Sequence, residues 1–531
     1  MLYIDRKPFR QIGVFKINII SKLLKRIFNR TVVCVIGIAI QVTYFVMFFW
    51  TLGTAFTYSY FLFSVLGMVL AVYIANSDIN PSYKIAWIIP VLAVPVFGSM
   101  FFLFFGNSHS GDRLRKRMNR FNEESKLLLP QNREITEQLG KDNRVVEKQA
   151  NYLYAYGGYP VYGNTSTTYF PLGEDKFKAL LEELKKAERF IFLEYFIIEE
   201  GEMWDTILDI LKRKAAEGVD IRVIYDDFGC LFTLPYKYNE QLEKYGIKCR
   251  VFNKFKPIWS AKMNNRDHRK ILVIDGHTAF NGGINLADEY INAYPKHGHW
   301  KDTAVMLKGE AVWSFTMMFL TMWNYLNNSK PDNYSIYMPR AEDIAAYKGK
   351  GFVIPYTDSP LDDEPVGENV YLNIINEAKR YVYITTPYLI IDNEMSRALI
   401  LAAKSGIDVR IITPHIADKW FVHAVTRAYY KQLVKYGVKI YEYTPGFIHG
   451  KSFVSDDRTA VVGSINLDFR SLYLHFECAT WMYETDSVAD VKEDFLKTME
   501  VSQEITYEDC LKVGIFRRMA RALLRLFAPM M

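Results

Sequence analysis

Two short segments of this chain carry the same reactive side chains at the same spacing. Each reads His-x-Lys, then four residues, then Asp, in "HRKILVID" and again in "HGKSFVSD". The residues concerned are His268, Lys270, Asp275, His449, Lys451 and Asp456. An imidazole can attack phosphorus or move a proton, and an ammonium can neutralise a phosphate oxygen. One match has little weight, but two indicate an internal repeat suited to an anionic substrate.

A matching tail follows each segment. "NGGIN" ends at Asn285 and "VGSIN" ends at Asn466, each about ten residues after the aspartate of its segment. The asparagine amides could donate hydrogen bonds to a substrate phosphate, so we include both among the substrate-binding candidates. Residues i and i+2 of a strand share one face, so His268 and Lys270 should project together from the start of a strand.

The elements around the segments repeat as well. In the first half, "RFIFLEYFII" reads as a strand, "MWDTILDILKRKAAEG" as a helix and "VDIRVIYDD" as a strand. In the second half, "RYVYITTPYLI", "MSRALILAAKSG" and "IDVRIITP" follow the same order. Alternating strands and helices indicate α/β layers. We predict two tandem α/β domains, 151–345 and 346–510, related by a pseudo-twofold axis that brings both segments into one cleft.

The first hundred residues are predicted to be a membrane anchor. Uncharged apolar stretches cover residues 31–50, about 56–75 and 85–106, each near the ~20 residues of a spanning helix. Two or three transmembrane helices over 31–106 are therefore expected, the last kinked or shallow because of Pro90 and Pro95.

Both flanks of this anchor are basic. They are an N-terminal segment, 1–30, and a linker, 107–150, that contains "DRLRKRMNR". Basic flanks favour the cytoplasm, but three full spans cannot place both flanks there, whereas two can. We favour a cytoplasmic linker, because it joins the large α/β part directly, and hence a cytoplasmic N-terminal segment.

Composition fits a membrane-bound protein. Hydrophobic residues make up 50% of the 531 residues, and the net charge of +6 is too small to favour a nucleic-acid binder. Five scattered cysteines show no disulfide or metal spacing, which fits a reducing compartment. The end of the chain, 511–531, contains "GIFRRMARALLRLF", a basic amphipathic helix. It could lie on anionic lipid or pack on its own domain with a solvated basic face.

The paired segments resemble those of the phospholipase D superfamily, and the layout resembles the bacterial cardiolipin synthases. The phrases that carry the second resemblance include "HWKDTAV", "TPYLIIDNEM" and "VGSINLDFRS". Two features depart from the family pattern: the residues before Thr31 together with the first apolar stretch are additions to the usual two-helix anchor, and Lys301 stands where an arginine is expected.

The resemblance implies a phosphatidyltransferase of the bacterial cell membrane, multi-pass, with its catalytic domains on the cytoplasmic side. His268 would attack phosphorus of phosphatidylglycerol to give a phosphohistidine, and His449 would act as acid and base. Each motif aspartate would orient a histidine. Lysines and asparagines supply the electrophilic stabilisation, so no metal and no cofactor are implied.

Some assignments remain open at the level of the sequence. Glu477, a further substrate-site candidate, could lie behind the second motif's histidine or bond within the core. A phospholipase or another phosphatidyltransferase, using water or a different alcohol, would need identical catalytic residues. A nuclease of the same superfamily and a scaffold with inactive motifs fit less well, because the apolar segments argue against the first and the two intact motifs against the second. Oligomeric state is not indicated.

Overall fold

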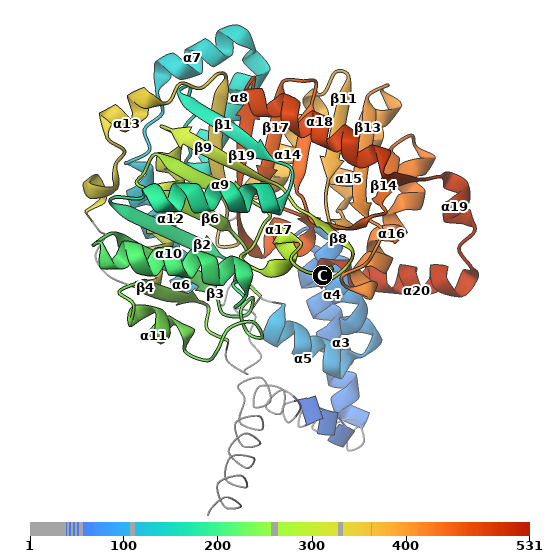
Figure 1. Ribbon diagram of the computed structural model, residues 1–531. Helices are drawn as coiled ribbons and strands as arrows, with labels where there is room; N and C mark the ends of the chain where they lie inside the picture. Colours follow the sequence, from blue (N-terminus) through green and yellow to red (C-terminus); the bar gives the residue numbers. More distant parts are fainter. Residues whose placement is uncertain are drawn as a thin grey trace, which may run out of the picture.

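Two α/β units lie side by side above a group of short apolar helices (Figure 1). The computed structural model describes residues 57–106, 112–255, 264–327, 333–362 and 364–530, with isolated positions between 39 and 51. The predicted N-terminal segment, 1–30, and most of the first apolar stretch lie outside the described residues.

The first unit is built on a mixed sheet in the order β1-β9-β7-β6-β2-β3-β4. The strands are β1 (Thr165–Phe170), β2 (Phe190–Tyr195), β3 (Asp220–Asp226), β4 (Lys248–Phe252), β6 (Lys270–Ile274), β7 (Thr278–Gly282) and β9 (Ala304–Gly309). β2, β3 and β4 are parallel, whereas β6 returns antiparallel to β2. Every residue of β2 is buried, because helices cover both faces of the sheet.

The second unit repeats this order as β10-β19-β17-β16-β11-β13-β14, with β20 added at the edge and β5 paired to β19. The strands are β5 (Arg266–Asp267), β10 (Phe352–Asp358), β11 (Tyr381–Thr385), β13 (Asp408–Pro414), β14 (Lys439–Tyr443), β16 (Ser452–Ser455), β17 (Thr459–Gly463), β19 (His475–Tyr483) and β20 (Ser502–Ile505). Because each strand has a counterpart in the same position, the predicted α/β repeat is confirmed.

Helices cover the sheets and join the two units. The helices of the α/β part are α9 (Gly173–Lys186), α10 (Glu202–Ala216), α11 (Tyr238–Glu243), α12 (Val312–Asn327), α13 (Ala341–Ala346), α14 (Val366–Glu377), α15 (Asn393–Lys404), α16 (Trp420–Lys435), α17 (Phe469–Tyr473), α18 (Asp486–Glu500), α19 (Tyr507–Leu511) and α20 (Ile515–Leu526). Short turns are η2 (Leu153–Gly157), η4 (Asp288–Ile291), η5 (Tyr334–Tyr337) and η6 (Ala528–Met530). Fourteen consecutive residues of α12 are buried, since this helix packs against strands of both units.

The predicted basic linker, 107–150, is helical where the structure describes it. It forms α6 (Asp112–Lys126), α7 (Arg133–Asp142) and most of α8 (Arg144–Tyr152). Met118, Phe121 and Leu139 of these helices belong to the same buried apolar cluster as residues of both units. The basic residues therefore occupy the outer faces of packed helices rather than a free connection.

Two short parallel ladders connect the units at the centre. β5, from the first unit, pairs with the start of β19, whereas β8 (His299–Lys301) pairs with β15 (Gly446–Ile448). A further two-stranded ladder, β12 (Leu389–Ile390) with β18 (Leu467–Asp468), lies within the second unit. In each half, the short strand that directly precedes the reactive segment therefore pairs with a strand of the other half.

Below the two units lie three apolar helices, α3 (Thr57–Ala75), α4 (Pro81–Ala93) and α5 (Pro95–Phe105). The third apolar stretch, predicted as a single helix, is broken at Val94, because Pro95 cannot donate to the preceding turn and instead begins α5. Within the described residues, no helix combines the length and the apolar character that crossing a bilayer requires. The predicted transmembrane helices are therefore not confirmed there.

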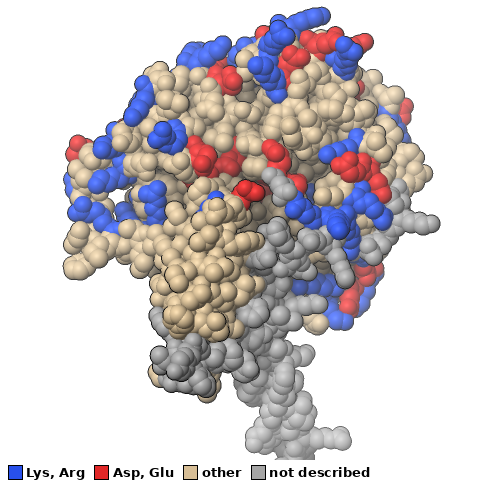
Figure 2. Space-filling view, turned by 180° about the vertical axis from the view of Figure 1, so that it is seen from behind, with Lys and Arg blue, Asp and Glu red and all other residues tan. Residues whose placement is uncertain are grey.

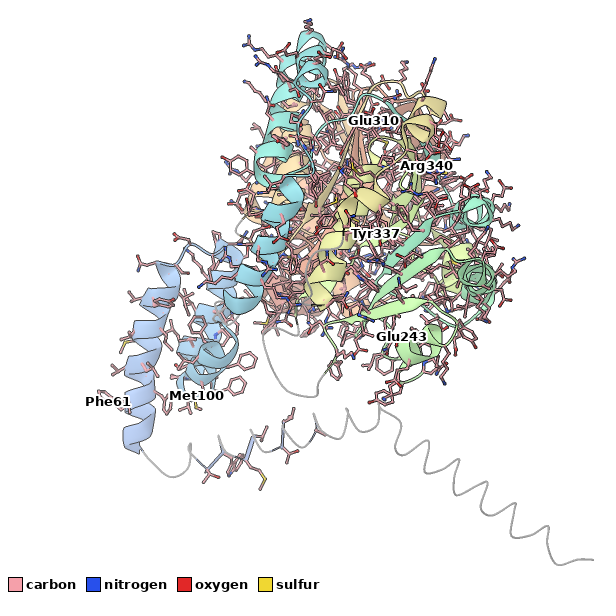
Figure 3. All side chains as sticks on the ribbon, turned by 90° about the vertical axis from the view of Figure 1, so that its left-hand side faces the viewer. Phe61, Met100, Glu243, Glu310, Tyr337 and Arg340 are labelled. Atoms are coloured by element: carbon pink, nitrogen blue, oxygen red, sulfur yellow. The ribbon has the colours of Figure 1, made fainter. Side chains whose placement is uncertain are left out.

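These helices present a large apolar surface. Phe61 projects from the outer side of α3 and is 70% exposed (Figure 3). Figure 2 shows almost no charged side chains over this lower part of the molecule. Other exposed apolar residues are Leu62, Val65, Met68, Val69, Val72, Ile85, Ile89, Leu92, Phe97 and Leu103. A surface of this kind marks an interaction site rather than an ordinary solvent-facing region.

Candidate active site

Each reactive histidine lies between a short strand that pairs with the other half and a strand of its own sheet. His268 follows β5 and precedes β6, and its backbone N–H donates to the carbonyl of Phe476 at 2.9 Å. His449 follows β15 and precedes β16, and its N–H donates to the carbonyl of Lys301 at 2.6 Å. Both imidazoles are therefore anchored by the backbone of the opposite half.

A carboxylate from the opposite half holds each ring. His268 Nδ1 lies 2.8 and 3.0 Å from the two oxygens of Glu477, and His449 Nδ1 lies 2.6 Å from Asp302 Oδ2. The two acids occupy equivalent positions in the two halves. Asp302 stands two residues before Ala304, which pairs with Gly282, and Glu477 stands two residues before Ala479, which pairs with Gly463. This reciprocal exchange is what a twofold relation between the halves produces.

The carboxylates are themselves fixed. Ser471 Oγ donates to Glu477 Oε1 at 2.6 Å, and Ser464 Oγ donates to the other oxygen. Glu477 is fully buried. It was predicted to bind substrate, and one open position for it was behind the second motif's histidine; instead it orients the histidine of the first. With Nδ1 bound to an acid, the Nε2 of each ring remains for chemistry.

The two lysines are buried beside the histidines. Lys270 and Lys451 are each 1% exposed, and each ammonium donates to the backbone carbonyl of the histidine in its own motif. Burial lowers the pKa of Lys270 to about 7 and that of Lys451 to about 8. These sites lack a full countercharge, so a bound phosphate would restore the protonated forms.

The four groups share one electrostatic environment. Burial, followed by the charges of Lys270, Lys451 and His449, holds the pKa of His268 well below its usual 6.5. Burial and Lys451 together lower the pKa of His449 to about 4, although Asp302 opposes the shift. The structure thus brings both histidines and both lysines together, and both imidazoles are neutral at neutral pH in the absence of an anion.

The motif aspartates lie elsewhere, which corrects their predicted role. Asp275 follows β6, at the end opposite to His268, and its carboxylate accepts hydrogen bonds from the backbone N–H groups of Glu188, Arg189 and Phe190 at 2.8–2.9 Å. Asp456 makes the same contacts with the N–H groups of Lys379, Arg380 and Tyr381. Both adopt positive φ, 54° and 56°. Neither orients a histidine, because a whole strand separates them from the rings.

The two asparagines differ. Asn285 accepts from the N–H of Ile197 at 3.0 Å and donates to the hydroxyl of Tyr290 at 2.7 Å, so its amide already has protein partners. Asn466 Oδ1 is buried and has no hydrogen-bond partner among the described residues. Of the pair, only Asn466 therefore keeps part of its amide unengaged.

Asp302 was missed by the sequence reading, although a signal for it exists. "KDTAV" and "FECAT" both place an acid two residues before an alanine of the returning strand. Lys301, the departure from the family pattern, points away from the histidines and forms an ion pair with Asp494 at 2.7 Å. The substitution of lysine for arginine therefore does not touch the reactive rings.

Within the described part of the chain, one cluster has donor atoms close enough to hold a metal ion: His268, His475 and Glu477, within 4.8 Å of one another. In this arrangement both oxygens of Glu477 already accept hydrogen bonds from His268 and the two serines. The prediction that no metal takes part stays a prediction.

Family models match most of the described chain. The model described as "Cardiolipin synthase, PLD-like domain" matches residues 180–315 and 371–499, and so covers both halves of the site. The model described as "Phospholipase_D-nuclease N-terminal" matches residues 61–107, the apolar helices.

Individual proteins are similar over nearly the full length. A cardiolipin synthase of Alkalihalophilus pseudofirmus is 32% identical over 487 residues, which cover 91% of this chain and 95% of that protein. A protein of Streptococcus mutans described as uncharacterized is 47% identical over 467 residues, 88% of this chain and 100% of its own length. The crystal structure of a phosphatidylserine synthase from Haemophilus influenzae has the same fold, with a TM-score of 0.51 and 14% identity over 72% of this chain and 98% of that one.

Proposed function

The chain belongs to the cardiolipin synthases of the phospholipase D superfamily and is a phosphatidyltransferase; on this premise we propose that it joins two phosphatidylglycerol molecules into cardiolipin and releases glycerol. The observation that carries the proposal is the pair of acid-held imidazoles with two lysines in one buried site. Such a site can exchange one phosphate ester for another of similar energy without a nucleotide.

The reaction proceeds in two displacements at phosphorus. Nε2 of His268 attacks the phosphate of the first lipid, and His449 gives a proton to the departing glycerol oxygen. The P–O bond to glycerol breaks as the N–P bond forms. His449 then takes the proton of the second lipid's terminal hydroxyl, whose oxygen attacks phosphorus and frees His268. Lys270 and Lys451 neutralise the non-bridging oxygens during both steps.

Since the diester is an anion, its arrival raises the pKa of both imidazoles and both lysines. That shift gives His449 the proton that it needs as the acid. Glu477 stabilises the positive charge that develops on His268 during attack, as Asp302 does for His449.

The surroundings of His449 favour a lipid alcohol over water as acceptor. The rings of Tyr290, Trp300 and Phe447 lie 5.5–5.9 Å from the ring of His449. His268 packs against Phe196 at 5.0 Å. An apolar rim of this kind excludes bulk water and accepts acyl chains, whereas a hydrolase needs access for water.

Incubation of the purified protein in detergent with phosphatidylglycerol alone tests this function. We expect cardiolipin and glycerol in equal amounts. Phosphatidic acid as the main product would instead show hydrolysis, and product formed only with another added alcohol would show a different acceptor.

The covalent step can be tested separately. Phosphatidylglycerol labelled in its phosphate should leave label on His268 of the His449→Ala variant after a quench without acid. Label on His449 in the reciprocal variant, with none on His268, would exchange the two roles. Label on neither would show direct transfer between lipids.

The exposed apolar faces of α3–α5 support a position of the enzyme at its lipid substrate. We infer that these faces contact the hydrocarbon of the bacterial cell membrane, with the catalytic units on the cytoplasmic side. Arg115, Lys116 and Arg120 of α6 follow the apolar helices directly, and such basic residues favour the cytoplasmic side. Labelling of a cysteine placed at Arg120 should therefore require a membrane-permeant reagent in intact cells.

A further inference from the structure

The C-terminal helix α20 lies on the second unit with Arg521 half-buried against that unit, whereas Arg517, Arg518 and Arg525 are exposed. α20 contacts α16, and the guanidinium of Arg525 stacks on the ring of Tyr429 at 4.2 Å. The apolar residues of the other side are exposed: Ile515, Phe516, Met519, Leu523, Leu526 and Phe527. The sequence left two alternatives open for this helix, and both stay predictions: α20 packs on α16, and its exposed apolar face remains available to lipid.

A groove of about 310 Å³ separates α16 from α20. The residues that matter here are Trp420, His423, Arg427, Arg517, Arg521 and Leu524. Arg427 is neutralised by Glu442, with its Nε 2.7 Å from Glu442 Oε1. Among the described residues, no carboxylate forms an ion pair with Arg517 or Arg521.

The groove therefore carries uncompensated positive charge. Burial lowers the pKa of the Arg521 guanidinium, and the neighbouring charges of Arg427 and Arg517 lower it further. Glu442 already pairs with Arg427 and His415, and within the described part of the chain neither Glu442 nor Asp509 forms an ion pair with Arg521. An anion in the groove would relieve this repulsion, and arginine forks suit phosphate oxygens.

The apolar surroundings of the groove indicate that the anion it binds belongs to a lipid. Trp420, at the rim, is 74% exposed, as is typical of a side chain at a membrane interface. α20 continues into η6, whose Ala528 and Pro529 are buried and which contacts α4 of the apolar group. In Figure 1, α20 runs along the lower edge of the second unit toward α4. The groove, the exposed face of α20 and the apolar helices thus form one continuous surface.

We propose that the groove between α16 and α20 binds the phosphodiester of an anionic membrane phospholipid that is not the lipid being transferred. Its acyl chains would lie along the exposed face of α20. α16, which forms one wall of the groove, also packs against β12 and β14 of the second catalytic unit. A lipid bound here would hold that unit against the bilayer. This inference does not depend on which lipid is transferred.

Quenching of Trp420 by brominated lipid tests the proposal. The full-length protein is titrated in mixed micelles with dibrominated phosphatidylserine or dibrominated phosphatidylcholine, and the signal of a Trp420→Phe variant is subtracted. We expect saturable quenching by the anionic lipid only. Arg517→Gln/Arg521→Gln should weaken it at least 10-fold. Arg521→Gln alone should already weaken it, whereas Arg518→Gln, the same loss of one charge on the exposed part of the helix, should leave it unchanged.

Several results would overturn the proposal. One is equal quenching by phosphatidylcholine, and another is equal affinity in the double variant and the Arg518→Gln control. A third is complete displacement by millimolar inorganic phosphate, which would indicate a site for a free anion. Cardiolipin formation in detergent by the double variant is measured in parallel. Because these arginines are not in the catalytic machinery, that activity should persist, and its absence from the wild-type protein would contradict the proposed function alone.

Discussion

At the scale of single residues, the chemistry depends on the two acids that hold the histidines. We expect Asp302→Asn and Glu477→Gln each to lower kcat about 10²–10⁴-fold, because an amide keeps the packing but not the ring orientation or the charge. Steady-state assays in detergent, with circular dichroism to confirm folding, measure the effect. A loss below about 3-fold in either variant would contradict this role.

Asp275 provides the matched control for these acids. Asp275→Asn weakens a carboxylate that accepts from three backbone N–H groups, so we expect a loss of about 1–3 kcal/mol of unfolding free energy. Because the residue does not contact a histidine, kcat of the folded variant should stay within about 3-fold of wild type. Denaturant titration and kinetics together separate the two effects.

The buried lysines give opposite pH dependences of activity and stability. With pKa values of about 7 and about 8, Lys270 and Lys451 lose their protons in the free enzyme as pH rises through that range, so kcat/KM should fall. In the unfolded chain lysines stay protonated to about 10.5, so the unfolded state binds more protons and stability should rise with pH over this window. Initial rates and unfolding titrations at pH 6–9 test both signs. A constant kcat/KM across pH 6–9 would contradict the lowered values.

Much of this site could be predicted from the sequence, and its omissions have a physical cause. His268, Lys270, His449 and Lys451 repeat at fixed spacing on strand starts, which a sequence shows directly. The partners of the histidines come from residues far along the chain; "KDTAV" and "FECAT" repeat the acid, but the repeat does not show which histidine each acid holds. Asp275 and Asp456 repeat just as regularly, but their repetition reflects a turn that occurs in both halves and not a role in catalysis.

At the scale of elements, the two short ladders between the halves, β5 with β19 and β8 with β15, determine where the histidines lie. A Cβ on Gly446 would approach the backbone O and N of His299 to 2.2 and 2.3 Å, so Gly446→Ala must shift β15 away from β8. We expect kcat to fall at least 10-fold, since His449 and Asp302 directly follow these two strands.

Gly163→Ala is the control for that substitution. There the added Cβ would meet only Ile135, at an ordinary 3.7 Å. Wild-type activity in Gly446→Ala, with folding intact, would show that the ladder does not position the ring.

Periodicity predicted the strands and helices of both units, but it failed for features that depend on packing. Residues 107–150 were predicted to be a basic linker because their charges dominate, yet Met118 and Leu139 are buried. For the stretch 85–106, Pro90 and Pro95 predicted a kinked or shallow helix, whereas the structure divides it into two helices at Val94.

At the scale of the whole molecule, one chain completes one site. If so, a mixture of full-length His268→Ala and His449→Ala variants should be as inactive as either alone, because each polypeptide lacks one of its own two rings. Activity is measured after co-purification, to allow any exchange between chains. Recovery to about a quarter of wild type would show that sites form between chains.

The reciprocal exchange of acids also sets the order of events during synthesis on the ribosome. A nascent chain that has made His268 and its lysine has no carboxylate for the ring until β19 emerges, some two hundred residues later. The partner of His449 is already present when that histidine is made. A chain that ends before Glu477 therefore lacks the acid that holds His268, and by the mechanism proposed above it should not release the head groups of the membrane in which it is being made.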